Sequence, residues 1–315
     1  MAAPEAPRTE RTRLAVAGAR SVTAAAVTGK QPIKDILKGR LFFALLLFAV
    51  GIALLGLAML IIDALIEGRE RLDLSVVTES ASRITPEDAG YANAIVGTVY
   101  LIGAVILMTV PIGIGAALYL EEYANRDRWW NRLVEVNIQN LAAVPSIVYG
   151  ILGLAFIVRG PLDLGFILFA GSITLALLVL PTVILASREA IRAVPPSIRE
   201  GSLALGATKW QTIRRQILPA SIPGIATGVI LAVSRAAGET APLLLVGASS
   251  FVTFNPTYFS DAGYTALPVL IFNNAKQAQE EFRILAAAGI IVMLLVILAM
   301  NSFAIWLRNR YEQQW

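Results

Sequence analysis

Residues 197–246 read SIREGSLALGATKWQTIRRQILPASIPGIATGVILAVSRAAGETAPLLLV, a polar segment followed directly by a long apolar run. Two consecutive prolines end the preceding segment. Ser197, with Glu200 three residues later, has the spacing of a capping box that starts a helix. Gly206 is the residue type that ends helices, because glycine readily adopts the left-handed backbone conformation found there. The pattern predicts a short capped helix from 197 to about 205.

A second capping box follows at Thr208 and Gln211, and it predicts another short helix that leads to Leu218-Pro219. The apolar run 222–246 begins soon afterwards. It is long enough to cross a hydrocarbon core, which needs about 20 residues. Two small helices bounded by proline and glycine just before a membrane span indicate a rigid docking element.

The composition indicates an integral membrane protein. Of the 315 residues, 57% are hydrophobic and 15% are charged, which is more apolar surface than a soluble domain of this size can bury. The net charge of +4 is modest and the basic residues lie between apolar runs, so no nucleic-acid partner is expected. The sequence has no Cys, no His and no P-loop motif. This excludes disulfides, thiolate or imidazole metal sites and P-loop binding of ATP by this chain.

Six apolar runs predict an all-α polytopic membrane protein with six transmembrane helices. The second run contains Pro111 and is over-long, which predicts a kink or an interfacial extension. Pro145 indicates that the residues before it in the third run approach at an angle. The six runs cover residues 41–62, 92–119, 141–158, 164–186, 222–246 and 284–307.

The distribution of Lys and Arg predicts the orientation of the spans, because cytoplasmic loops are enriched in these residues. Nineteen of the 26 lie in the N-terminal tail, after the second span, in the loop 187–221 or at the C-terminus. Six lie on the opposite side, and Arg235 is within a span. Both termini and the loop 187–221 are therefore expected to be cytoplasmic. Glu121 and Glu122, at the end of the second span, are expected to face the cytoplasmic interface.

The chain is expected to divide into four segments. Residues 1–40 form a basic cytoplasmic tail with an interfacial helix at 34–40, and no cleavage site of a signal peptide follows it. Residues 41–91 hold the first span and an acidic outer loop. Residues 92–307 form the transmembrane core, and residues 308–315 form a cytoplasmic C-terminus.

The fifth predicted span contains one positive and one negative charge. Arg235 and Glu239 are four residues apart and would share one face of a helix. Arg235 lies about 20 Å along that helix, near mid-membrane. Charged residues at this depth are costly and usually functional, so we expect the pair and Thr240 to line a translocation path. The alternative is a buried ion pair that only holds two helices together. The arginine fork suits an oxyanion such as phosphate, and the carboxylate keeps the anion from being trapped.

The loop around Gly206 resembles the cytoplasmic coupling loop of bacterial ABC-importer permeases. That loop carries Glu-Ala-Ala, then three residues, Gly, and a later Leu-Pro. The matching residues here are Glu200-Gly201-Ser202, Gly206 and Leu218-Pro219. The sequence departs from the pattern where Gly201-Ser202 replaces the paired alanines, where Leu205 stands in place of Asp and where Gln216 stands in place of Ile.

The block Gly238-Glu239-Thr240-Ala241-Pro242 makes the resemblance more specific. Together with residues 97–124 and 141–154, it resembles the A-type permeases of high-affinity phosphate importers (PstA). The resemblance covers roughly residues 92–307. It implies the type I ABC-importer permease fold, and a multi-pass protein of the bacterial inner (plasma) membrane that contacts lipid.

The resemblance also implies a function and partners. The chain would be a transmembrane permease subunit of an ATP-driven phosphate importer, and not itself an enzyme. Its partners would be a second permease, two cytoplasmic ATPase subunits and an extracytoplasmic phosphate-binding protein. ATP and magnesium would bind to the ATPase subunits, so no cofactor is expected in this chain. The residues expected to couple to the ATPase are Ser197, Glu200, Gly201, Gly206, Ala207 and Trp210.

Three alternatives remain open at this stage. A permease for another oxyanion or a small nutrient would keep the coupling loop but would not need the Gly-Glu-Thr-Ala-Pro block. An ion-coupled secondary carrier could use Glu239, but it would leave the capped helix unexplained and no internal repeat supports it. A membrane enzyme is the least favoured class, because no nucleophile–base pair is visible and the commonest general base is absent.

Overall fold

The computed structural model describes residues 33–82, 84–125, 127–248 and 252–311. The described residues form helices and connecting loops, and their only β-type pairing is an isolated bridge between Ala248 and Tyr264. The prediction of an all-α fold is therefore confirmed. The chain separates into two units, residues 1–60 and 61–315, which are described individually.

The first unit contains most of α2 (Ile33–Gly68), an apolar helix of 36 residues. A helix of this length measures about 54 Å, which is ample for a membrane span. Residues 34–40 are helical as predicted, but they form the first turns of α2 and not a separate helix, and their interfacial position stays a prediction. Apolar residues follow without a helix-ending signal, so nothing separates the two segments. The rest of the predicted tail, residues 1–32, lies outside the described residues.

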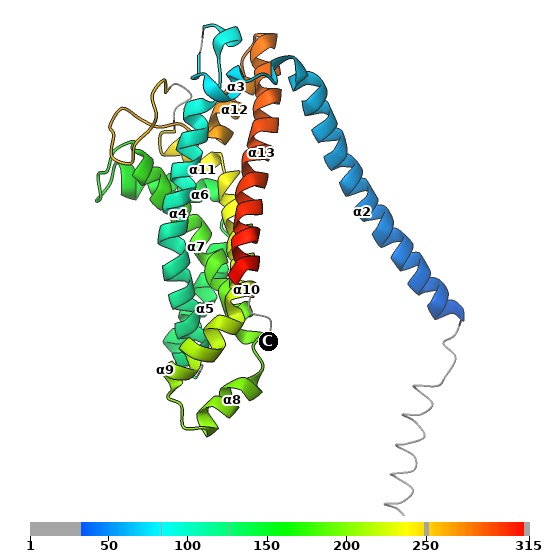
Figure 1. The fold of residues 1–315 in the computed structure, drawn as a ribbon, viewed down its shortest axis with the longest axis vertical. Coiled ribbons are helices and arrows are strands. Elements are labelled where there is room, and N and C mark those ends of the chain that lie inside the picture. Colours follow the sequence, from blue (N-terminus) through cyan, green and yellow to red (C-terminus); the bar gives the residue numbers. More distant parts are fainter. Residues whose placement is uncertain (1–32, 83, 126, 249–251, 312–315) are drawn as a thin grey trace, which may run out of the picture. The chain divides into compact units, whose positions relative to one another are not determined.

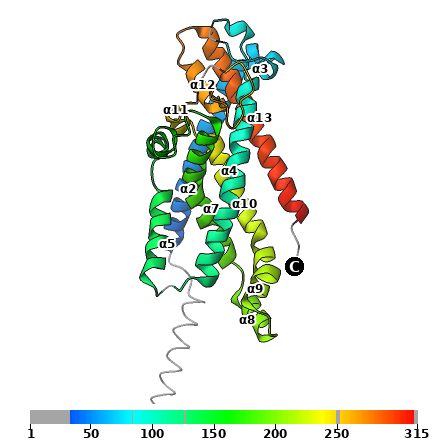
Figure 2. The same cartoon turned by 90° about the vertical axis from the view of Figure 1, so that its left-hand side faces the viewer.

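Four long helices form the body of the second unit: α4 (Ala92–Leu118), α7 (Leu168–Arg192), α10 (Leu218–Ala237) and α13 (Glu280–Tyr311) (Figures 1 and 2). Glycines allow their backbones to approach closely. A Cβ on Gly113 of α4 would press against Val183 of α7, and one on Gly228 of α10 would press against Ala186 of α7. Helix α7 is therefore packed between α4 and α10.

The second predicted span continues beyond its predicted end. Helix α4 passes through Pro111 and leads into the π-helical turn η3 (Tyr119–Tyr123), which gives one helical stretch, Ala92–Tyr123. This stretch confirms the predicted extension.

Short elements cover the two ends of the second unit. One end holds η1 (Arg69–Arg71), α3 (Ser75–Thr78), η2 (Pro86–Asp88) and α12 (Leu267–Ala275), packed around the buried Tyr91. The hydroxyl of Tyr91 donates to the carbonyl of Leu285 at 3.1 Å and accepts from the amide of Asn274 at 3.0 Å. The opposite end holds α8 (Pro196–Ala204), α9 (Lys209–Thr212) and the π-helical turn η5 (Ile213–Ile217). We call it the α8–α9 end.

The third predicted span, 141–158, is a broken helix rather than a straight one. Helix α5 (Trp129–Ala142) stops, and α6 (Ser146–Leu152) continues into the π-helical turn η4 (Gly153–Val158) after a bend of 106°. Pro145 precedes α6 and disfavours a helical conformation for Val144, which explains the position of the break.

The fifth predicted span, 222–246, is also broken. Helix α10 ends at Ala237, and the short α11 (Ala241–Leu245) follows the Gly-Glu-Thr sequence. In the described part of the chain, five helices are long and apolar enough to cross a membrane, or up to six if α5 and α6 form one span.

Candidate functional site

The charged residues of the fifth span lie at its break. Arg235 is in the last turn of α10, and Glu239 lies beyond the helix end, so the expected continuous helical face does not exist. The two side chains still meet, with Arg235 Nε 3.5 Å from Glu239 Oε1. The Arg235 side chain is 57% exposed and that of Glu239 is 16% exposed. Thr240 precedes α11, and its carbonyl accepts the first hydrogen bond of that helix from Leu244.

The break between α5 and α6 lies beside this one. Tyr149 of α6 belongs to the same buried cluster as Ala236 and Ala237, the last two residues of α10. The next residue, Gly150, packs so closely that a Cβ there would lie 2.7 Å from Cα of Pro242 in α11. The structure therefore brings two broken helices together.

The side chain of Tyr149 forms a hydrogen bond across the break between α5 and α6. The last carbonyls of a helix lack partners within the helix. The hydroxyl of Tyr149 donates to the carbonyl of Leu141, near the end of α5, at 2.9 Å. Tyr149 thus both fixes the bend and packs against the end of α10.

The helix register places the breaks deep in the bundle. Gly224 and Gly228 of α10 face Ala190 and Ala186 of α7. Continuing this antiparallel register brings Arg235 level with about Val179, nine residues before Arg188. That separation is about 13 Å along α7, nearly half the thickness of a hydrocarbon core. Irregular backbone at such a depth is found where it is buried in protein or lines a polar cavity.

The loop between α7 and α10 differs from the prediction at its start. Helix α8 begins at Pro196 and has Pro195 as its N-cap, and no side chain caps it. The predicted capping box of Ser197 and Glu200 is therefore wrong. Proline at the first helical position already has the required backbone angle, which moves the helix start one residue upstream.

The remainder of the loop follows the prediction more closely. Helix α8 ends at Ala204, and Gly206 has a φ of +84°, the left-handed conformation expected of it. The second capping box is confirmed: the amide of Gln211 donates to Thr208 Oγ1 at 3.3 Å, and the amide of Thr208 donates to Gln211 Oε1 at 2.8 Å.

The second loop helix does not stop at Leu218-Pro219. Helix α9, the turn η5 and α10 form one helical stretch, Lys209–Ala237. The π-helical turn ends at Ile217, two residues before Pro219, which lacks the N–H needed for a regular helix at that point. The loop is therefore continuous with the span that carries Arg235.

The residues expected to couple to the ATPase lie on the outer surface of the loop. All except the half-buried Ala207 are exposed. A pocket of about 460 Å³ opens between α8, α9 and η5, and its lining includes Ser197, Gly201 and Ala207. Leu205 at the tip of the loop is 90% exposed, so the outer surface of the loop includes a large apolar side chain.

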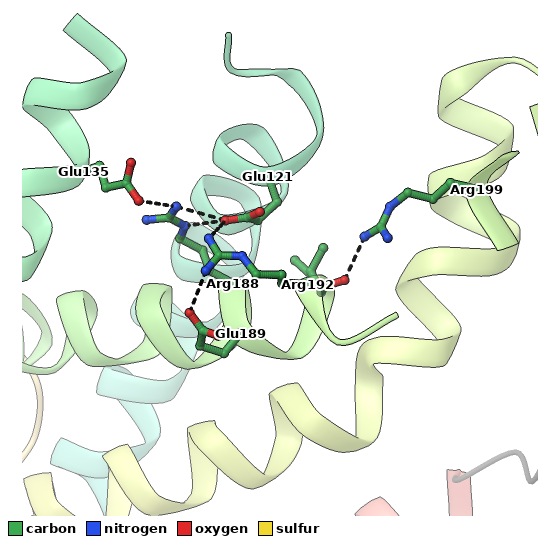
Figure 3. A network of polar contacts seen from close by, with 7 residues as sticks. Glu121, Glu135, Arg188, Glu189, Arg192 and Arg199 are labelled. Atoms are coloured by element: carbon green, nitrogen blue, oxygen red, sulfur yellow. Dashed lines mark hydrogen bonds and ion pairs between the residues drawn. The ribbon is translucent and has the colours of Figure 1, made fainter. Parts of the chain in front are cut away.

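Sequence reasoning missed a network of ion pairs at the α8–α9 end (Figure 3). Arg188 of α7 donates from Nε to Glu121 of η3 at 2.9 Å and from Nη2 to Glu135 of α5 at 2.7 Å. Arg192 donates from Nη2 to the same Glu121 oxygen at 2.7 Å and from Nη1 to Glu189 at 3.2 Å. The network joins η3, which continues α4, to the middle of α5 and to the last turns of α7.

Glu121 and Glu122 lie at the α8–α9 end, and their position at a cytoplasmic interface stays a prediction; the structure shows instead that their side chains are largely covered. Their side chains are 4% and 9% exposed, because arginines from α7 and α8 cover them. One indication of this network is present in the sequence: two carboxylates (121 and 122) and two arginines (188 and 192) lie just after the ends of two predicted spans. Only packing decides which of them meet.

Comparison with known proteins identifies the family. Residues 109–313 match the family described as "Binding-protein-dependent transport system inner membrane component". The chain belongs to this family. The permease is also 34% identical to the Yersinia pestis "Phosphate transport system permease protein PstA", over 85% of this chain and 88% of that one. It is 32% identical to the Haemophilus influenzae PstA, over 84% and 91% of the two chains.

Solved structures support the type I importer fold. The permease matches a chain in "Crystal structure of bacterial alginate ABC transporter in complex with alginate pentasaccharide-bound periplasmic protein" with a TM-score of 0.62 and 19% identity, over 90% of this chain and 99% of that one. A chain of the MetNI methionine transporter in an inward-facing conformation matches with a TM-score of 0.55 and 14% identity, over 70% and 94% of the two chains. The fold class predicted from the sequence is confirmed.

Proposed function

We propose that this permease is the transmembrane subunit of an ATP-driven phosphate importer. The single observation that carries the proposal is the Arg235–Glu239 pair, which lies at a helix break deep in the bundle of a chain related to PstA proteins. In this proposal the permease forms one half of the translocation path and converts ATPase movement into alternating access. ATP hydrolysis would take place in the partner ATPase subunits, so this chain would not be an enzyme.

Arg235, Glu239 and Thr240 would form the part of the path that recognises the anion. The long 3.5 Å contact and the 57% exposure of Arg235 leave most of its donors available. A guanidinium fork donates two parallel hydrogen bonds to an oxyanion. Glu239 beside it reduces the positive field, and a permeation site needs such weak binding to release its ion.

The loop helix α8 would dock on an ATPase subunit. Glu200 of α8 is exposed, as are Gly206 in the following turn and Trp210 of α9. The exposed apolar side chain of Leu205 at the tip of the loop can be buried by a partner protein. The continuous helix Lys209–Ala237 leads from this loop to Arg235, so a rigid-body movement of the loop can reach the helix break.

The complex would contain a second permease, two ATPase subunits and an extracytoplasmic phosphate-binding protein. ATP and magnesium would bind to the ATPase subunits, and this chain would hold no cofactor. The permease would cross the inner membrane several times with both termini in the cytoplasm, which agrees with the excess of Lys and Arg in the loop 187–221.

Uptake of radiolabelled phosphate into proteoliposomes with the purified complex tests this proposal. We expect uptake that requires both ATP and the binding protein and that excess sulfate does not inhibit. Uptake driven by an ion gradient without ATP would instead identify a secondary carrier, and ATP-driven uptake of sulfate alone would identify a permease for another oxyanion.

A pair of charge reversals tests the path. Glu239→Arg is expected to abolish phosphate uptake while the complex still assembles, because it places two positive charges together. Glu280→Arg reverses an exposed carboxylate at the start of α13 and is the matched control, with near-normal uptake expected. Normal uptake by Glu239→Arg would remove this pair from the path.

A further inference from the structure

Arg199 of α8 contacts two other elements of the permease at once. Its Nε donates to Glu122 Oε1 of η3 at 2.9 Å. Its Nη1 donates to the carbonyl of Val194, two residues beyond the end of α7, at 2.7 Å, and its Nη2 donates to the carbonyl of Ile191 in the last turn of α7 at 2.8 Å. Figure 3 shows Arg199 reaching across from its own helix towards the end of α7. One guanidinium thus joins α8 to both α4 and α7.

The chemistry of the contact makes it a rigid one. The carbonyls near a helix end lack intrahelical partners and carry a partial negative charge, which a cation stabilises. A guanidinium presents its donors in a fixed planar fork, so binding three acceptors fixes its orientation as well as its position. The acceptor Glu122 is 9% exposed and Arg199 is 23% exposed, so water competes little for these bonds.

The two elements that Arg199 contacts, η3 and the end of α7, are also bound to each other. Glu121, adjacent to Glu122, is bound by Arg188 and Arg192 of α7, so η3 and α7 are joined independently of α8. The apolar cluster beneath contains Ala117 of α4, Ile191 of α7 and Ile217 of η5. Helix α8 is therefore attached to a pre-assembled base.

Further contacts tie the loop to the same base. Ser202 of α8 shares a hydrogen bond with Thr212 of α9 at 2.9 Å. Lys209 Nζ lies 4.9 Å from the centre of the Tyr123 ring in η3, a cation–π contact. Helix α9 thus also contacts the end of α4, but Arg199 supplies the directional hydrogen bonds that hold α8.

We infer that Arg199 is the positioning residue that transmits movement of α8 to the spans α4 and α7. This inference rests on the proposed function, in which an ATPase moves α8. When α8 is displaced, the Arg199 fork carries Glu122 and the end of α7 with it, so α4, α7 and α8 move as one body. Without the fork, α8 can move while the spans stay in place.

The coupling ratio, phosphate transported per ATP hydrolysed, is the first test. Arg199→Gln is expected to lower this ratio about fivefold or more, the range of typical coupling energies, while ATP hydrolysis continues. Arg199→Lys keeps the charge but cannot reach three acceptors, and it is expected to restore part of the ratio. Arg214→Gln, an exposed arginine of the same loop, is the matched control and should leave the ratio unchanged.

A double-substitution cycle isolates the pair. If Arg199 acts through Glu122, then Arg199→Gln combined with Glu122→Gln lowers the ratio no further than Arg199→Gln alone. An unchanged ratio in Arg199→Gln, an equal loss in Arg214→Gln, or fully additive losses in the double variant would each overturn the inference.

A distance measurement separates failure of this inference from failure of the proposed function. The chain contains no cysteine, so Ala204→Cys at the end of α8 and Tyr119→Cys on η3 can carry spin labels in the assembled complex. We expect one narrow distance distribution with and without ATP, and a broad or ATP-dependent one in Arg199→Gln. A distance that changes with ATP when Arg199 is present would overturn the inference, whatever the substrate is.

Discussion

Arg188 and Glu121 form an ion pair in which the two side chains are only 5% and 4% exposed, with Nε and Oε1 2.9 Å apart. The pair joins α7 to the end of α4, and Glu135 from α5 completes it. A buried charge is tolerated only when it is paired, because removal from water is costly. This contact therefore fixes three spans at one level.

Replacing Arg188 alone should destabilise the permease strongly. Arg188→Met leaves the Glu121 carboxylate with one arginine fewer, and we expect a loss of about 3–5 kcal/mol in the free energy of unfolding. Thermal unfolding in detergent measures this loss. Arg214→Gln, which changes an exposed arginine, should shift the stability by no more than about 0.5 kcal/mol. Equal stability of the two variants would contradict a structural role for the network.

Gly228 should tolerate no side chain at its contact with α7. A Cβ there would press on the Cβ of Ala186, so Gly228→Ala is expected to lower stability by about 1–3 kcal/mol. Gly115→Ala is the matched control, because a Cβ at Gly115 meets nothing within 4 Å. That variant should gain up to about 1 kcal/mol from the higher helix propensity of alanine. A stable Gly228→Ala would show that α7 and α10 are farther apart.

Substitution of Gly206 should affect coupling through the backbone. At a φ of +84°, a β-branched residue is strained, whereas asparagine tolerates the left-handed region better. We expect Gly206→Val to reduce the phosphate transported per ATP and Gly206→Asn to retain most of it. If both variants behave alike, the conformation of this turn is not what matters for coupling.

Loss of the Tyr149 hydroxyl should loosen the bend between α5 and α6. Tyr149→Phe removes the 2.9 Å hydrogen bond to the Leu141 carbonyl, which is expected to cost about 1 kcal/mol of stability. Because the ring also packs against the end of α10, we expect slower uptake as well. Tyr119→Phe removes an exposed hydroxyl and serves as the control, with both quantities unchanged. Normal uptake by Tyr149→Phe would mean that the bend is held by packing alone.

Much of the fold follows from local patterns. Apolar runs of about 20 residues predict where the long helices lie, although the third and fifth runs form broken helices. The Thr208–Gln211 box and Gly206 predict the turn between α8 and α9. An error occurs where proline allows two outcomes: Pro195-Pro196 starts α8 instead of only ending the preceding segment. The angled approach predicted from Pro145 is confirmed by the 106° bend between α5 and α6.

The candidate site could be predicted only in part. Arg235, Glu239 and Thr240 stand out in an apolar run. The helix end at Ala237 was missed, although Gly238 at the C-cap and Pro242 four residues later are residue types that end or interrupt helices. The sequence around Arg235 does not indicate that the break at 143–145 lies beside it, or that Tyr149 bonds to the carbonyl of Leu141 there. These features depend on α6 packing against α11.

The sequence by itself determined that this chain is a helical membrane protein, where its spans lie and which charges they contain, because burial of apolar residues and helix capping are local properties. Tertiary structure alone decided which charges meet: Arg199 with Glu122, Arg188 with Glu121, and two broken helices at one depth. A charge can be paired only by a partner that packing brings within about 4 Å, and residues more than 60 positions apart meet only when the helices between them have packed.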